Sequence, residues 1–380
     1  MAGIYIHVPF CSKRCTYCDF FSNTQMQYKA PFLKQVLQEL TLRKAYLRNA
    51  LIDPIETIYF GGGTPSQLNP KEFEAILNHI YKHYTVSPSA EITMEANPDD
   101  LTPTYLKAIA SLPFNRLSMG IQSFNDTDLK FLNRRHSAQQ AIAAVANCQA
   151  VGLTNLSIDL MYGLPNQTLE AWRENLKQAI ALNVPHISAY HLIYEAGTAL
   201  YKLMEAGKVR SVDEDVSLAM FTTLIDTLSS NGYLHYEISN FAQPHYISQH
   251  NSAYWKGKPY LGIGPSAHSY DGVNRAWNIA SLTGYIEAME QHKPALEVEI
   301  LDLQAQYNDF ILTGLRTMWG INLKEIENTF GGKLALYCKK QAAPYIKSGL
   351  LCLSENDTLT LSREGIFISD SVMSDLMFVL

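Results

Sequence analysis

The sequence has no apolar run long enough to cross a membrane, because its apolar stretches are short and interrupted by polar residues. It also has no surplus of positive charge: 30 Lys and Arg stand against 36 Asp and Glu, a formal net charge of −6. No basic block, internal repeat or low-complexity linker interrupts this balance. General attraction to nucleic acid or to an anionic membrane surface is therefore not expected.

Residues 1–10 are apolar but carry no charged leader and no long apolar stretch. They predict a buried strand rather than a signal peptide, and we expect a cytoplasmic protein. Cysteine is scarce, with six residues in 380, and three of these are scattered among apolar neighbours at Cys148, Cys338 and Cys352. We interpret these three as small buried hydrophobic residues rather than ligands or disulfide partners.

The chain is 47% hydrophobic, which is enough to bury a large core with a second, smaller domain beside it. In the first half, short β-type runs alternate with amphipathic helical stretches such as 30–47 and 70–84. The six predicted strands are residues 4–8, 57–60, 91–96, 116–121, 156–161 and 186–191. Repeated strand–helix units imply parallel strands, and both a doubly wound sheet and a barrel-like sheet fit them. In either fold, reactive groups lie at the carboxyl ends of the strands.

After about residue 194 this alternation ends, and an aromatic and glycine-rich region extends to Tyr270. From residue 301 three helical patterns are followed by a hairpin-like segment and a last helix, which suggests a winged-helix-like module. The three predicted helices are residues 303–318, 323–330 and 334–348. This module has more acidic than basic residues, which favours packing or partner docking over DNA binding.

Three cysteines, Cys11, Cys15 and Cys18, form a C-x3-C-x2-C pattern in the loop after the first predicted strand. Thiolates are the usual ligands of iron–sulfur clusters, and four of them saturate a [4Fe–4S] cluster. Three leave one iron open for a small molecule. Structural zinc is the alternative, but it needs a fourth ligand, and the nearby candidate, His7, lies in a strand with no second cysteine pair to follow. The pattern favours the cluster.

Polar and glycine residues stand at the ends of the following strands. The second strand ends in three consecutive glycines and Thr64, which let the backbone approach a ligand closely. Glu95, Gln122 and Asp159 stand at the ends of the third, fourth and fifth strands. Each could alone cap a helix or form a salt bridge, but their shared location predicts a common pocket.

Together these residues resemble the radical S-adenosylmethionine (SAM) superfamily, in which the open iron binds the amino and carboxylate groups of SAM. The resemblance implies an α/β fold with a partial (β/α)6 barrel, a [4Fe–4S] cluster on the three cysteines, and electron transfer that cleaves the SAM sulfonium. The SAM-binding positions it implies are Tyr5, Tyr17, Gly62, Gly63, Thr64, Glu95, Gln122, Arg134 and Asp159. It further implies a barrel over residues 1–240, an extension packed on it over 241–300, and a mainly helical, winged-helix-like domain over 301–380.

Within this superfamily, almost the whole chain is similar to the oxygen-independent coproporphyrinogen III oxidase family. The decarboxylating members carry a longer N-terminal extension and a further cysteine where this chain has Phe20. Radical chemistry on a tetrapyrrole, such as the decarboxylation of coproporphyrinogen III, is therefore the alternative hypothesis to the function described next. A third interpretation, a scaffold with a purely structural cluster, is disfavoured by the complete set of SAM-site side chains.

The segment from His250 to Trp255, H-N-x-x-Y-W, is similar to the signature of the heme-chaperone branch of that family, called HemW. A neutral imidazole ligates heme iron and aromatic rings pack on the macrocycle, although the same residues can form an aromatic core with one satisfied histidine. The resemblance implies a heme chaperone with His250 as the candidate heme ligand and His268 as a second candidate.

The partners that this resemblance implies are heme and an acceptor hemoprotein of respiration. No nucleic acid partner is expected. Membrane contact is expected only peripherally, through the acceptor, and the chain is expected as a monomer or a homodimer.

Overall fold

The structure is a computed structural model that describes residues 2–47 and 54–379. Its largest element is one twelve-stranded sheet in the order β12-β11-β10-β9-β1-β2-β3-β4-β5-β6-β8-β7. Six neighbouring strands run parallel and confirm the six predicted ones. They are β1 (Ala2–Val8), β2 (Ile55–Gly62), β3 (Val86–Ala96), β4 (Arg116–Gln122), β5 (Leu156–Tyr162) and β6 (His186–His191).

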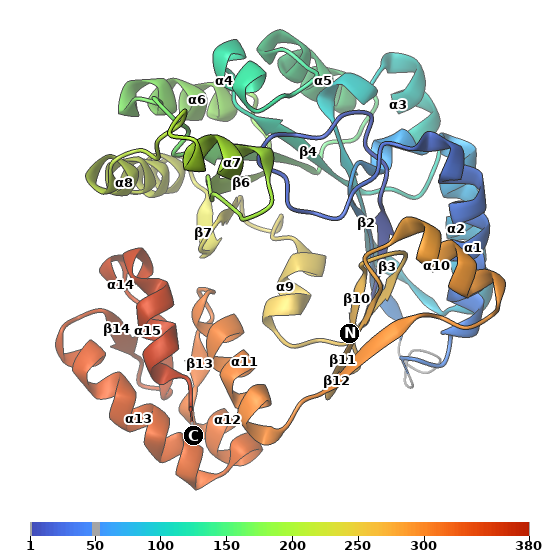
Figure 1. The fold of residues 1–380 in the computed structure, drawn as a ribbon. Helices are drawn as coiled ribbons and strands as arrows, with labels where there is room; N and C mark the ends of the chain where they lie inside the picture. Colours follow the sequence, from blue (N-terminus) through green and yellow to red (C-terminus); the bar gives the residue numbers. More distant parts are fainter. Residues whose placement is uncertain (1, 48–53, 380) are drawn as a thin grey trace.

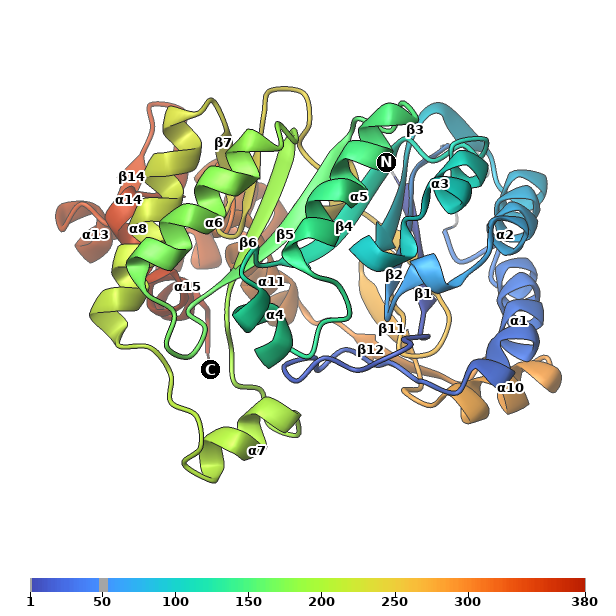
Figure 2. The same cartoon turned by 90° about the horizontal axis from the view of Figure 1, so that it is seen from above.

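Side chains alternate between the two faces of the parallel strands, as the period of two requires. In β1, Ile4, Ile6 and Val8 are fully buried in the main hydrophobic core, whereas Tyr5 and His7 belong to the opposite, concave face. Helices cover the outer face of the sheet (Figures 1 and 2). The principal ones are α1 (Lys29–Leu42), α2 (Pro70–His83), α3 (Pro103–Ile109), α5 (Ala138–Ala150), α6 (Leu169–Ala181) and α8 (Glu214–Ser230).

The sheet is curved but open, which confirms the partial barrel and excludes the doubly wound alternative. On one edge β9 (Tyr260–Ile263) runs parallel to β1, and antiparallel strands continue from it. These are β10 (His268–Tyr270), β11 (Asn274–Asn278) and β12 (Leu296–Ile300). Helix α10 (Leu282–Glu290), which connects β11 to β12, packs against α1 on the outer side. On the other edge β8 (Asn240–Ala242) and β7 (Leu234–Glu237) are antiparallel to β6.

Residues 241–300 thus extend the sheet of the barrel, and one helix from this part, α9 (Gln249–Trp255), lies inside the curve (Figure 1). The aromatic and glycine-rich composition of this region did not predict these strands. The division at residues 240 and 300 stays a prediction.

The C-terminal residues form a second hydrophobic core with helices around a three-stranded antiparallel sheet. The predicted helices and the hairpin are confirmed, and a short further strand joins the hairpin. The elements are α11 (Leu303–Leu315), β13 (Ile321–Asn322), α12 (Leu323–Phe330), α13 (Gly332–Lys347), β14 (Leu351–Leu353), β15 (Thr358–Leu361), α14 (Arg363–Phe367) and α15 (Ser369–Leu376). The interpretation of Cys352 as a buried residue is wrong: it is exposed on the edge strand β14, while Cys148 and Cys338 are buried.

The two cores are joined by backbone hydrogen bonds and an ion pair. The Met318 amide donates to the Tyr236 carbonyl (3.0 Å), and the Ile238 amide donates to the Arg316 carbonyl (3.2 Å). Arg316 also contacts the buried Glu237 carboxylate at 2.9 Å. Across residues 2–47 and 54–379, every helix is too short or too polar to cross a membrane.

Candidate functional site

The three clustered cysteines lie in a loop that starts where β1 ends. The loop is closed at its base, because the Cys11 amide donates to the Asn23 carbonyl (3.0 Å) and the Asn23 amide donates to the Pro9 carbonyl (2.6 Å). The Cys11 sulfur lies 3.2 Å from the Thr64 hydroxyl at the end of β2. The cysteine loop and the glycine-rich turn therefore meet at one edge of the sheet.

Arg134, in the segment between the helices Asp126–Phe131 and Ala138–Ala150, contacts the middle of the cysteine loop. Its guanidinium donates to the Cys15 sulfur (3.3 Å), to the Gly120 carbonyl (2.5 Å) and to the Asn97 side chain (2.6 Å), and its Nε has no partner. A nearby cation favours the thiolate form that binds metal. Burial acts in the opposite direction and raises the pKa of Cys18 to about 11. We expect cluster assembly to release protons from this loop.

The donor set fits an iron–sulfur cluster better than a single ion. Within the described ranges, no three histidine, cysteine or acidic side chains are close enough to hold one metal ion. The three thiols are nevertheless neighbours, since the charges of Cys11 and Cys15 both raise the pKa of Cys18. Three neighbouring cysteines are a ligand set that fits a [4Fe–4S] cluster with one iron left open.

The turn after β2 is shaped by glycine. Gly62 has φ +106°, and a side chain there would come within 2.6 Å of the His7 ring. A side chain at Gly61 would come within 3.1 Å of Glu95 and one at Gly63 within 2.9 Å of the β1 loop backbone. Only glycines allow this close approach. The Gly63 amide donates to the Val8 carbonyl (2.9 Å), and the Gly62 backbone hydrogen-bonds to Glu95.

Two partly buried carboxylates, Glu95 and Asp159, lie on the concave side, and no cation of the described residues is at ion-pair distance from either. Glu95 accepts a hydrogen bond from Tyr59 (2.7 Å), and burial raises its pKa to about 7. Burial also raises the pKa of Asp159 to about 6. Arg116 is 1% exposed, and its Nε and Nη1 have no hydrogen-bond partner. Unpaired carboxylates of this kind fit a cationic ligand, and SAM carries an amino group and a sulfonium.

The remaining predicted SAM positions lie at the same edge. Gln122 adopts φ +70° where β4 ends, and a side chain at Gly120 would lie 3.0 Å from its amide and 3.3 Å from Arg134. The buried phenol of Tyr17 interacts with the charges of Arg134 and the cysteines. Tyr5 stacks on Tyr59 with 6.1 Å between ring centroids. The structure thus brings the predicted cluster and SAM residues together.

His250 lies on α9 at the floor of the concave face, is 1% exposed, and stacks on Tyr5, one of the predicted SAM positions, with 6.4 Å between ring centroids. Its ring stacks on Tyr59 at 4.9 Å, with Nδ1 hydrogen-bonded to Thr57 (2.8 Å) and Nε2 to Tyr254 (2.7 Å). Burial lowers its pKa to about 3, so the ring is neutral. Ligation of iron by this ring requires that one of the two hydrogen bonds break.

The other candidate, His268, is exposed on β10 and stacks on Trp277 at 5.5 Å, so the structure does not bring the two histidines together. Sequence reasoning missed Tyr59, Asn97 and Arg116. Tyr59 and Arg116 lie in predicted strands, at positions that alternate onto the concave face. That alternation is the signal that could have identified them.

Comparison with known proteins places this geometry in a family. Residues 5–179 match the profile described as Radical SAM superfamily, and residues 301–368 match the HemN C-terminal domain. The chain is 32% identical to "Heme chaperone HemW" of Lactococcus lactis, over 98% of this chain and 96% of that protein. It is 33% identical to the protein of the same name from Mycobacterium tuberculosis, over 99% and 94% of the two chains.

Among solved structures, coproporphyrinogen III oxidase (HemN) from Escherichia coli has the same fold. The TM-score is 0.86 at 24% identity, and the match covers 100% of this chain and 90% of that one.

Proposed function

The chain belongs to the radical SAM superfamily and, within it, to the HemW family, and on this premise we propose that it is a heme chaperone. It binds heme and passes it to an acceptor hemoprotein. It carries a [4Fe–4S] cluster on Cys11, Cys15 and Cys18, with SAM at the open iron.

One observation carries the proposal: the segment expected to bind heme is in direct contact with the SAM pocket. His250 stacks on Tyr59, and the Tyr59 hydroxyl donates to Glu95. Glu91 accepts the amides of Gln249 and His250, at 3.0 and 2.9 Å, and so anchors α9 to β3. A change in the SAM pocket therefore has a short physical route to the heme segment.

The residues of the chain divide the remaining tasks. The three cysteines hold the cluster, which when reduced supplies one electron to the sulfonium of SAM. Arg134 donates to the Cys15 sulfur and to the Asn97 side chain and so orients the loop. Glu95 and Asp159 orient the cationic ligand from the opposite side.

The acceptor is a respiratory hemoprotein, and the chaperone meets it in the cytoplasm or at the inner face of a membrane. Contact with the membrane then occurs only through the acceptor. The chaperone works as a monomer or a homodimer.

The alternative, oxidative decarboxylation of coproporphyrinogen, shares the same cluster and SAM pocket. Phe20, at the position where the decarboxylating enzymes have a further cysteine, is 67% exposed. An exposed phenylalanine offers no ligand or redox group there. An assay for coproporphyrinogen turnover under reducing conditions with SAM tests this alternative, and the proposal expects no product.

Heme binding is tested by anaerobic reconstitution of the cluster, followed by titration with ferric heme and measurement of the Soret band. The proposal predicts saturation near one heme per chain. His250→Ala, run in parallel, tests the hypothesis that His250 ligates the iron: an unchanged spectrum and stoichiometry would remove His250 as a ligand. Absence of saturable binding by the unaltered protein would contradict the chaperone function itself.

A further inference from the structure

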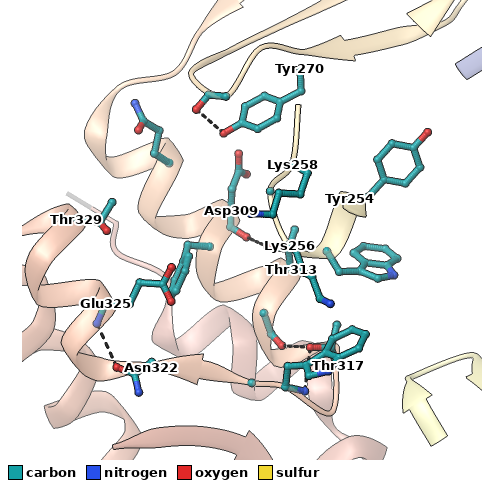
Figure 3. Close-up of a pocket in the computed structure, with 18 of the residues that line it drawn as sticks. Tyr254, Lys256, Lys258, Tyr270, Asp309, Thr313, Thr317, Asn322, Glu325 and Thr329 are labelled. Atoms are coloured by element: carbon teal, nitrogen blue, oxygen red, sulfur yellow. Dashed lines mark hydrogen bonds between the residues drawn. The ribbon is translucent and has the colours of Figure 1, made fainter. Parts of the chain in front are cut away.

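A cavity of about 740 Å³ lies between the turn that follows α9 and the C-terminal domain (Figure 3). One wall is formed by residues 254–260 together with β10 and β11, and the other by α11, β13 and α12. The volume is within the usual range for sites that enclose an organic ligand. The last two residues of the H-N-x-x-Y-W segment, Tyr254 and Trp255, belong to its lining.

The lining is rich in aromatic side chains from both walls. Trp255 comes from the end of α9, while Trp319 and Phe310 come from the C-terminal domain. The Arg316 guanidinium lies 4.9 Å from the centre of the Trp255 ring, and the buried indole nitrogen of Trp255 has no hydrogen-bond partner. Such walls offer large, flat apolar surfaces to a planar ligand.

Two lysines on the barrel side provide positive charge without an acidic partner. Figure 3 shows Lys256 and Lys258 on the wall opposite Glu325. Lys256 Nζ lies 3.9 Å from the centre of the Trp319 ring, and no carboxylate in the described part of the chain is within ion-pair distance of either lysine. The charge of Lys258 lowers the pKa of Lys256, after the larger effect of burial. Two neighbouring cations that repel each other attract a ligand with two acidic groups.

The cation Arg275 is not available in the same way, because it pairs with Asp309 and, at 3.5 Å, with Glu299. Of the cations that line the cavity, Lys256 and Lys258 are thus the ones that can form an ion pair with a ligand. Glu325 lies on the opposite wall and repels negative charge. The acidic groups of a ligand are therefore favoured at the wall that carries the two lysines.

The lining holds no histidine, cysteine or methionine. Two of its tyrosine hydroxyls are already engaged: Tyr254 bonds to His250, and Tyr270 donates to the Gly272 carbonyl at 2.8 Å. In Figure 3 the Tyr254 hydroxyl points away from the two lysines. The third lining tyrosine, Tyr260, keeps its proton because burial raises its pKa to about 12, and a neutral phenol is a weak ligand of iron. A heme in this cavity therefore meets no imidazole, thiolate or thioether ligand from the lining.

We propose that this cavity is where the chain holds its heme, with the two propionates paired to Lys256 and Lys258 and the macrocycle packed on Trp255, Trp319 and Phe310. The inference rests on the proposed heme-binding function and adds the location and the mode of recognition. Affinity comes from the aromatic walls and the carboxylates rather than from an imidazole on the iron. An iron that the carrier holds weakly is ready to take the stronger ligand of an acceptor.

Titrations with three porphyrins test this mode of binding: ferric heme, iron-free protoporphyrin IX and its dimethyl ester. The proposal predicts that iron-free protoporphyrin binds within about threefold of heme, because the lining supplies no strong ligand. The dimethyl ester, which lacks both carboxylates, binds at least about tenfold more weakly than protoporphyrin.

The matched protein variants are K256E/K258E and, as a control, K107E/K130E, which reverses two exposed lysines on α3 and on the short helix α4 (Asp126–Phe131). Heme affinity is expected to fall at least about tenfold in the first pair and to stay unchanged in the second. Circular dichroism and the denaturation midpoint check that both are folded. Trp319→Phe, which keeps an aromatic wall, is expected to bind more tightly than Trp319→Ala.

The outcomes separate the location from the function. Tight binding by the unaltered protein that neither K256E/K258E nor esterification weakens overturns the cavity as the site and leaves the chaperone function standing. A loss of binding confined to His250→Ala, with iron-free protoporphyrin failing to bind, overturns it in favour of histidine ligation. Failure of the unaltered protein to bind heme at all overturns both proposals.

Discussion

Single side chains set the chemistry of the strand-end pocket. Among residues 2–47 and 54–379, Glu95 and Asp159 have no cation at ion-pair distance, and the buried cation Arg116 has no hydrogen-bond partner at two of its nitrogens. Groups held this way are costly in a folded protein and are retained where a ligand completes their interactions. The thiol loop shows the same imbalance, since burial raises the pKa of Cys11 and Cys18.

Replacement of one cluster ligand tests the metal assignment. Cys15→Ser is expected to lower the iron and sulfide bound per chain by at least about tenfold. Replacing a residue that only hydrogen-bonds to a metal ligand already lowers metal affinity by about this factor, and Cys15 is a ligand itself. Iron analysis and visible absorption after anaerobic reconstitution measure the effect. Cys352→Ser, at an exposed position on β14, is the control and is expected to retain the full cluster. Equal iron in both variants would exclude the cysteine loop as the binding site.

The raised pKa of Glu95 predicts how stability depends on pH. The folded protein holds this proton up to about pH 7, whereas the unfolded chain releases it near 4.5. The contribution of Glu95 to stability is thus fully present below pH 4.5 and is lost as the pH rises through 7. Denaturant titrations of the SAM-free protein between pH 4.5 and 7 measure this effect. The unfolding free energy is expected to fall less steeply with pH in Glu95→Gln than in the unaltered protein. The exposed Glu74→Gln is the control, and an identical decline in all three proteins contradicts the prediction.

At the scale of elements, α9 is the piece that connects the two candidate sites. It is only seven residues long and is held by contacts rather than by its own helical stability. Ser248 caps its first turn through the Asn251 amide, and Glu91 on β3 accepts the two preceding amides, those of Gln249 and His250. Thr57 holds the His250 ring from β2. The helix is therefore fixed to the floor of the barrel by its N-terminal half, and its C-terminal half is free to line the cavity.

Loss of the Glu91 anchor is expected to destabilise the fold. Glu91→Ala removes a buried carboxylate that accepts two amide hydrogen bonds, which predicts a loss of about 2–3 kcal/mol in unfolding free energy. Glu91→Gln, which can still accept one bond, is expected to lie between this variant and the unaltered protein. Chemical denaturation measures both, with the exposed Glu74→Ala expected within about 0.5 kcal/mol of the unaltered protein. A Glu91→Ala loss as small as that of the control would show that α9 is not anchored by this residue.

The parallel strands were predictable because each is a short apolar run followed by turn residues, a pattern that depends on local sequence alone. Strand β9 was not, because its pairing with β1 joins residues more than 250 positions apart, and its four residues carry no periodic signal. The residues of the candidate site divide in the same way into those that local sequence predicts and those that only the fold reveals. Cys11 and Glu95 lie in motifs at strand ends, whereas the isolation of Arg116 and the two hydrogen bonds of His250 depend on tertiary contacts.

At the scale of the whole molecule, the barrel and the C-terminal domain are two hydrophobic cores that meet at several places, including the contact of Phe367 on α14 with Phe221 on α8 (5.6 Å between ring centroids). Residues 236–238 meet residues 316–318 through backbone hydrogen bonds, and Arg316 bridges Glu237 on one side and the Trp255 ring on the other. The proposed heme cavity lies at this connection. Its shape therefore depends on how the two cores are held together.

Removal of the bridging arginine tests this connection. Arg316→Ala leaves the buried Glu237 carboxylate without its cation, which predicts a loss of about 2–3 kcal/mol in unfolding free energy. Arg363→Ala breaks an ion pair with Asp226 in which both side chains are exposed, and is expected to cost less than about 1 kcal/mol. Denaturation midpoints compare the two. Equal losses would contradict the role assigned to Arg316.

The most direct measurement of the central claim is heme transfer. The cluster-reconstituted protein is loaded with one heme, separated from free heme, and mixed with a heme-free respiratory hemoprotein, and the absorption spectrum of the acceptor is followed. The account predicts that the acceptor gains heme and activity at the expense of the carrier, faster than it does from free heme at the same concentration. Heme that stays with the carrier, or that reaches the acceptor only at the rate of spontaneous release into solution, would contradict it.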